Sequence, residues 1–160
     1  MSQSNSILET NFLNVKYDER NDKYMKTKAV RLYGKNDLRL EEFELPPIKE
    51  DEILARIVSD SICMSTYKAT IQGTDHKRVP KNVHEKPVII GHEFAGEIVE
   101  VGEKWKNEFK KGQKFSIQPA VNVPERPYDA PGYSYPYIGG AATYIIIPNE
   151  FMERKCLLNF

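Results

Sequence analysis

The sequence is poor in cysteine, histidine and long apolar runs. Its 160 residues include two cysteines and three histidines. Two cysteines are too few for a disulfide framework, so the fold depends on an apolar core, for which a hydrophobic fraction of 40% suffices. A chain of this length is expected to form one domain rather than two ordinary ones.

Neither sign of charge is in excess, since lysine plus arginine and aspartate plus glutamate both number 23. No window forms a basic stripe, so we expect neither a nucleic-acid partner nor binding to anionic lipid. No apolar run approaches the roughly 18 residues that a membrane span needs, and residues 1–20 lack the features of a signal peptide. The sequence therefore predicts a cytoplasmic protein that binds a small molecule or another protein.

Short strand-like segments separated by turn residues fill most of the chain. A short helix is expected over residues 65–73, which end on glycine. The pattern predicts a mainly β protein, a small barrel or sandwich. The expected strands lie within residues 28–33, 38–45, 52–60, 98–101, 113–120 and 141–150.

Two segments depart from this texture. Residues 1–24 are polar and are interpreted as an N-terminal extension. Residues 119–140 hold five of the ten prolines and four of the nine tyrosines, so no regular element is expected there. The tyrosines of this loop are expected either to line a cleft or to pack on the surface. They are Tyr128, Tyr133, Tyr135 and Tyr137.

Cys63 and His92 are the residue types that zinc prefers as ligands. They lie far apart along the chain, so only the fold could bring them together. In the alternative interpretation, Cys63 is a small buried residue and His92 a hydrogen-bonded turn residue. The residues alone leave both interpretations open. His76, His84 and Cys156 are expected to be two solvated side chains and an ordinary thiol.

The segment GHEFAGEIVEVG, residues 91–102, resembles the zinc signature of the medium-chain dehydrogenase/reductase family, which includes zinc alcohol and polyol dehydrogenases. That signature runs Gly-His-Glu, two residues, Gly, and an apolar strand to a further Gly. SDSICMSTYK, residues 59–68, is similar to the family's first zinc-ligand segment, and residues 28–59 and 139–150 are similar to its opening and closing strands. The resemblance thus covers residues 25–160.

The resemblance implies that residues 25–160 form a GroES-like catalytic domain, a partly open β-barrel with short helices that supplies a catalytic zinc. It also implies a Rossmann domain for NAD(P), of which this chain carries no G-x-G-x-x-G turn. We therefore expect a C-terminally incomplete enzyme that is inactive alone, and a homo-oligomer for the full-length protein. No structural zinc is expected, because the corresponding loop contains no cysteine.

By the same resemblance, Cys63 and His92 match zinc ligands, and Glu93 matches an acidic residue that ligates zinc in some members and lies behind it in others. The glycines at 91 and 96 are expected to allow a sharp turn that aims the imidazole.

Two further positions carry proposed catalytic roles. Ser65 matches the residue that relays the alcohol proton, although a helix N-cap is an equally open interpretation. Lys68 stands where many members have histidine, at the outer end of the relay. Thr66 stands where the family usually has aspartate beside the metal.

Several segments, GYSYPYIGG among them, are most similar to the sorbose-1-phosphate reductases of this family. This similarity implies a polyol or sugar-phosphate substrate, for which Lys77 and Arg78 are available cations unless their loop is simply solvated. The alternative function is a non-catalytic module that only folds or binds a partner.

Overall fold

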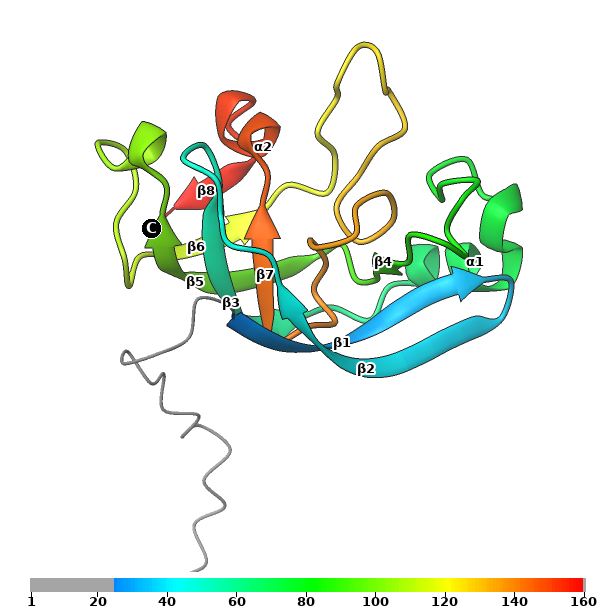
Figure 1. Cartoon of the computed structure of the whole chain (residues 1–160). Helices are drawn as coiled ribbons and strands as arrows, with labels where there is room; N and C mark the ends of the chain where they lie inside the picture. Colours follow the sequence, from blue (N-terminus) through cyan, green and yellow to red (C-terminus); the bar gives the residue numbers. More distant parts are fainter. Residues whose placement is uncertain (1–24, 160) are drawn as a thin grey trace, which may run out of the picture.

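Two antiparallel sheets dominate the computed structural model of the chain, which describes residues 25–159 (Figure 1). The expected extension over residues 1–24 lies outside the described residues. The first sheet has the order β2-β1-β4, from Asp37–Leu45, Met25–Gly34 and Val88–Ile89. The second has the order β7-β3-β5-β6-β8, from Tyr144–Ile147, Ile53–Asp60, Phe94–Val101, Lys114–Ile117 and Leu157–Asn159.

Short helices connect the strands. Helix α1 spans Met64–Gln72 and is followed by the 3-10 helix η1, Gly73–Asp75. A second 3-10 helix, η2, spans Glu103–Trp105, and helix α2 spans Asn149–Glu153. No helix within residues 25–159 has the length and apolar character that crossing a membrane requires.

The sheets are joined where β1 meets the segment that leads into β7. The Val30 amide donates to the Ala141 carbonyl at 2.8 Å, and the Thr143 amide donates to the Lys28 carbonyl at 3.0 Å. The fully buried Thr27 completes the joint, because its hydroxyl donates to the Tyr144 carbonyl at 2.7 Å, across 117 residues of sequence. Strand β1 is therefore held on one side by β2 and on the other by β4 and by residues that lead into β7.

The main core lies against the five-stranded sheet. Strand β5 alternates buried and half-buried residues from Phe94 to Ile98, as expected of a strand with one face on the core. Phe115, Ile145 and Phe151 are fully buried in the same cluster. Burying such side chains stabilises the fold by roughly 1.5–3 kcal/mol each.

The mainly β fold with short helices agrees with the sequence prediction. Helix α1 is confirmed and ends at Gly73, which has a φ of 54°. Residues 119–140 are irregular as expected, with one isolated bridge between Val123 and Arg126. The sequence did not reveal α2, β4 or β8, and β5 begins at Phe94 rather than near Ile98.

Candidate metal centre

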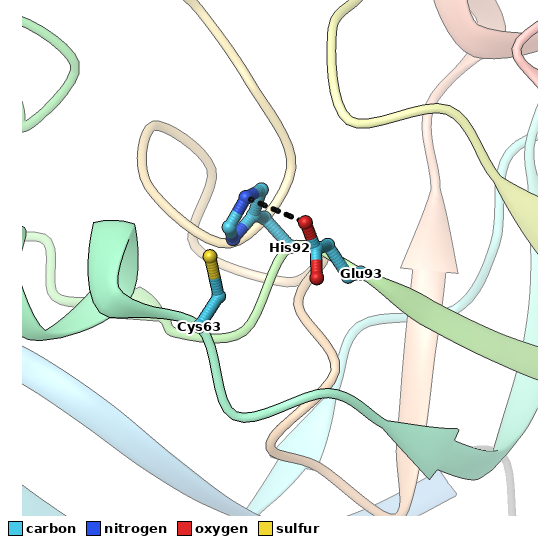
Figure 2. Close-up of side chains that lie close together, drawn as sticks. All are labelled: Cys63, His92 and Glu93. Atoms are coloured by element: carbon cyan, nitrogen blue, oxygen red, sulfur yellow. Dashed lines mark ion pairs between the residues drawn. The ribbon is translucent and has the colours of Figure 1, made fainter.

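Cys63, His92 and Glu93 converge at one point of the structure, where their side chains point toward one another (Figure 2). One potential ligand atom from each residue lies within 4.8 Å of the other two. Tetrahedral zinc with bonds of 2.0–2.3 Å requires ligand atoms about 3.3–3.8 Å apart, so small side-chain movements would close the site. The sulfur, nitrogen and oxygen donors fit zinc.

Cys63 is positioned by the turn between β3 and α1. It is the N-cap residue of α1, and its Sγ accepts a hydrogen bond from the Ser65 amide at 3.5 Å. The interpretation of Ser65 as the helix cap is therefore wrong, because the residue two positions earlier caps the helix.

His92 is positioned by a tight approach of three chain segments at Gly91. Gly91 has a φ of 90°, and a Cβ there would lie 2.2 Å from Asp60 Oδ2 and 2.8 Å from the Ala141 amide nitrogen. The turn expected at this glycine is confirmed. Gly96 does not form the expected turn, because it lies within β5 and its φ is not positive. A glycine is needed there because a Cβ would lie 2.4 Å from the Arg56 carbonyl oxygen.

The side chain of His92 is 6% exposed. Its Nε2 lies 3.7 Å from Glu93 Oε1, and the Glu93 side chain is 45% exposed. Burial lowers the pKa of His92, Arg78 adds to that effect, and Glu93 opposes it. The fold therefore favours the neutral imidazole, which is the form that binds metals.

The other imidazole nitrogen faces two hydroxyl groups. Nδ1 of His92 lies 3.1 Å from the Tyr133 hydroxyl and 3.4 Å from the Thr66 hydroxyl. The rings of His92 and Tyr133 are 4.9 Å apart. Thr66, which stands where the family usually has aspartate, thus contacts Nδ1 of His92, and Tyr133 contacts the same nitrogen.

The loop tyrosines were expected either to pack on the surface or to line a cleft. Tyr133 does neither, because it is 1% exposed. Its ring stacks on His76 at 5.6 Å, and the Arg78 guanidinium lies 5.3 Å from the ring centre. His76 was expected to be solvated, but this stacking leaves it half-buried. Its chain position gave no signal of this, because the contact depends on the path of a distant loop.

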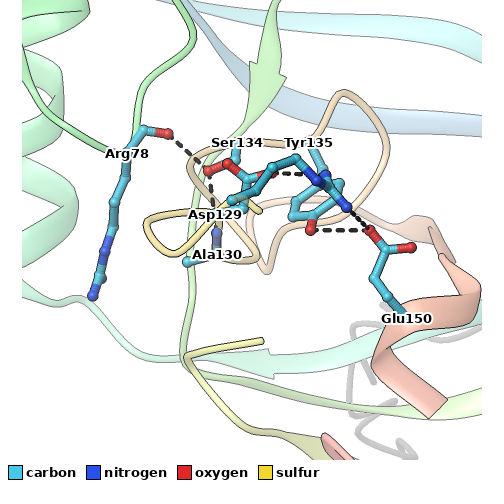
Figure 3. A network of polar contacts seen from close by, with 7 residues as sticks. Arg78, Asp129, Ala130, Ser134, Tyr135 and Glu150 are labelled. Atoms are coloured by element: carbon cyan, nitrogen blue, oxygen red, sulfur yellow. Dashed lines mark hydrogen bonds and ion pairs between the residues drawn. The ribbon is translucent and has the colours of Figure 1, made fainter. Parts of the chain in front are cut away.

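A network of polar contacts fixes the loop on both sides of Tyr133 (Figure 3). The Ser134 hydroxyl donates to the Arg78 carbonyl at 2.8 Å and accepts from the Ala130 amide at 3.1 Å. Next along the chain, the Tyr135 hydroxyl donates to Glu150 of α2 at 3.1 Å. The loop is thus tied to the segment around Arg78 and to α2.

The two expected relay residues differ in their surroundings. Ser65 is half-buried. Burial raises the pKa of Tyr133, and the Ser65 hydroxyl is one of the neighbouring groups that oppose this rise. Lys68 is exposed on α1. Lys77 is also exposed, with its ammonium 4.8 Å from the Tyr128 ring centre.

Asp60, which the sequence did not single out, lies beside the turn that carries His92. A Cβ on Gly140 would lie 2.3 Å from its carboxyl group, so the backbone approaches it closely. Burial raises the pKa of Asp60 to about 6, against the opposing hydrogen bonds from the Ser61 and Glu93 amides.

Residues 49–155 match the family described as the alcohol dehydrogenase GroES-like domain. L-sorbose 1-phosphate reductase of Klebsiella pneumoniae is 57% identical over 84% of this chain and 32% of the relative. Mannitol-1-phosphate 5-dehydrogenase of Aliivibrio fischeri is 51% identical over 84% of this chain and 31% of the relative. The chain spans about a third of the length of these curated relatives.

Among solved structures, 2R,3R-butanediol dehydrogenase from Bacillus subtilis superimposes with a TM-score of 0.67 and 26% sequence identity. The match covers 84% of this chain and 40% of that one. Together with the family match, this confirms the GroES-like fold and the resemblance to zinc alcohol and polyol dehydrogenases.

Proposed function

Because the chain belongs to the alcohol dehydrogenase GroES-like domain family, we propose that residues 25–160 are the catalytic domain of a zinc-dependent oxidoreductase. The reaction is the interconversion of a polyol or sugar-phosphate alcohol and its ketone. The observation that carries the proposal is the convergence of Cys63, His92 and Glu93, three residues of the types that hold a catalytic zinc.

Three protein ligands would leave one coordination position for substrate. In the proposed site Cys63 and His92 are the primary ligands, and Glu93 is a third ligand or lies just behind them. When bound, zinc would act as a Lewis acid toward the substrate oxygen, while NAD(P), held by a domain outside this chain, would exchange the hydride.

The chain's own residues would orient the substrate and move its proton. Ser65 is proposed to accept the alcohol proton, since a hydroxyl group both donates and accepts hydrogen bonds. Its half-buried position, two residues from Cys63, supports this role. Lys68 is proposed as the outer end of the relay, where its exposure would allow proton exchange with solvent.

The substrate class is supported by the names of two relatives, which specify L-sorbose 1-phosphate and mannitol 1-phosphate. A phosphorylated substrate requires a cationic partner, for which Arg78 and Lys77 are the candidates. Sorbose-1-phosphate reductase activity is the finer form of this proposal.

The decisive experiment measures zinc per chain after dialysis against trace zinc. We expect near-stoichiometric zinc in the parent and little in Cys63→Ser or His92→Ala. Cys156→Ser and His84→Ala serve as matched controls, since Cys156 is a buried thiol away from the trio and His84 is exposed. Both controls should retain zinc.

Equal zinc in all five proteins, each confirmed as folded by circular dichroism, would overturn the assignment. The alternative of a module without catalytic zinc would then be favoured. A loss in the two site variants alone would separate the proposed function from that alternative.

A further inference from the structure

We infer that Tyr133 is a positioning residue for the metal centre: its hydroxyl accepts the Nδ1 proton of His92 and thereby leaves the Nε2 lone pair available to a metal. The metal part of this inference rests on the proposed function. The effect on the proton of His92 is a property of the chain alone and can be measured without metal.

The tautomer follows from the chemistry of the ring. A neutral imidazole has one nitrogen that donates and one that accepts, and a metal takes the accepting one. Nδ1 is already contacted by Tyr133 at 3.1 Å and Thr66 at 3.4 Å, whereas Nε2 faces the Glu93 carboxylate at 3.7 Å. If Nε2 is the ligand atom, Nδ1 carries the proton and the nearer hydroxyl accepts it.

Tyr133 then has its own proton to donate. The hydroxyl groups of Thr66 and Ser65 both interact with the Tyr133 oxygen. Because a neutral hydroxyl group both donates and accepts, Tyr133 is proposed to donate its own proton to one of these oxygens at the start of α1. Tyr133 would accept from His92 on one side and donate to Ser65 or Thr66 on the other, linking the candidate ligand to the proposed relay residue.

The surroundings of Tyr133 hold its hydroxyl in this position. Its ring lies between the stacked His76 and the Arg78 guanidinium. The preceding Gly132 packs directly against the backbone of the His92 turn, since a Cβ there would lie 2.0 Å from the Gly91 carbonyl oxygen. The Ser134 contact shown in Figure 3 fixes the following residue. A side chain constrained at both neighbours can orient a ligand.

The test compares Tyr133→Phe with Tyr135→Phe. Tyr135 is the matched control, because it is also a buried loop tyrosine whose hydroxyl is hydrogen-bonded, but to Glu150 and not to the metal centre. The first readout is the ¹⁵N chemical shift pattern of His92 in the metal-free chain above its ordinary pKa. The second is zinc affinity, measured by competition with a chelator.

We expect the parent and Tyr135→Phe to show the Nδ1–H tautomer of His92. In Tyr133→Phe the Nε2–H form should become populated, and zinc affinity should fall about tenfold, as is usual when the partner of a ligating histidine is removed. A purely structural role would instead lower the stability of both variants without changing the tautomer.

The inference is overturned if the parent itself carries the Nε2–H tautomer, a result that needs no variant. It is also overturned if folded Tyr133→Phe matches the parent in both readouts. Failure of the parent to bind zinc, combined with the expected tautomers, would contradict the proposed function and leave the role of Tyr133 in orienting His92 intact.

Discussion

Gly132 packs against Gly91 so closely that a Cβ on Gly132 would lie 2.0 Å from the Gly91 carbonyl oxygen. This contact brings the proline- and tyrosine-rich loop onto the turn that carries His92. It also sets Tyr133 beside the imidazole, since each glycine immediately precedes one of the two interacting residues. The candidate metal centre thus depends on a backbone contact between two segments that are distant in sequence.

Substituting Gly132 should disturb both the fold and the site. In Gly132→Ala the new Cβ would clash with the Gly91 carbonyl, and alanine would also be strained at a φ of 74°. We expect the free energy of unfolding to fall by about 3 kcal/mol. Gly112→Ala is the control: φ is 82° but no atom lies within 4 Å of the added Cβ, so the loss should be about 1 kcal/mol. Urea denaturation measures both. Equal losses would contradict the importance of the contact.

Ser65→Ala should leave the stability of helix α1 unchanged. The cap is made by Cys63 Sγ and the Ser65 backbone amide, which alanine retains. We expect the free energy of unfolding to change by less than about 0.5 kcal/mol, whereas losing a side-chain cap costs about 1 kcal/mol. A loss of 1 kcal/mol or more in thermal or urea unfolding would show that the serine hydroxyl stabilises the fold.

The raised pKa of Asp60 predicts a specific pH dependence of stability. Because the folded carboxyl group titrates at about 6 and the unfolded one at 3.8, the folded state binds more protons between these values. Its contribution to stability is full below about pH 4 and is lost as the pH rises to about 6.

Asp60→Asn removes this titration. The stability of the parent relative to the variant should fall from pH 4 to pH 6 and stay level at higher pH. His76 and His92 titrate in both proteins, so their effects largely cancel in the difference. Parallel stability curves for the two proteins would contradict a raised pKa at Asp60.

Zinc should stabilise the folded chain by mass action. At a free zinc concentration of 100 times Kd, we expect about 2.7 kcal/mol of added stability and a higher melting temperature. The effect should weaken in acid, because protons compete with zinc for Cys63 and His92. His92→Ala should show no zinc-dependent shift in calorimetry. A shift of the same size in that variant would indicate that zinc binds elsewhere.

The amino-acid sequence carried strong signals for the fold and for the three candidate ligands. Short strand-like segments and turn residues predicted most of the strands, and the Gly-His-Glu segment pointed to His92 and Glu93 through family resemblance. Those signals are local, and the structure brings Cys63 to them because β3 and β5 pair next to each other.

The remaining features depended on contacts that no local pattern encodes. Tyr133 lies 41 residues from His92, and its alignment depends on the Gly132 contact rather than on any motif. Helix α2 went undetected because neither end has an ordinary signal. Its N-cap is Pro148, which makes no side-chain cap, and the turn after it uses Lys155 at a φ of 53°, where glycine or asparagine is usual.

The hydrogen bond between Thr27 and the Tyr144 carbonyl also has a consequence for synthesis on the ribosome. The two residues are 117 positions apart, and at about 5–20 residues per second the first waits roughly 6–23 seconds for its partner to be made. Strand β1 can pair with β2 almost at once and, at Arg31 and Leu32, with β4 once residues 88–89 are made. The part of its other edge around Thr27 stays open until Tyr144 is made. All three candidate ligands emerge before Tyr144, so the nascent chain carries the residues of the candidate metal centre before the two sheets can join.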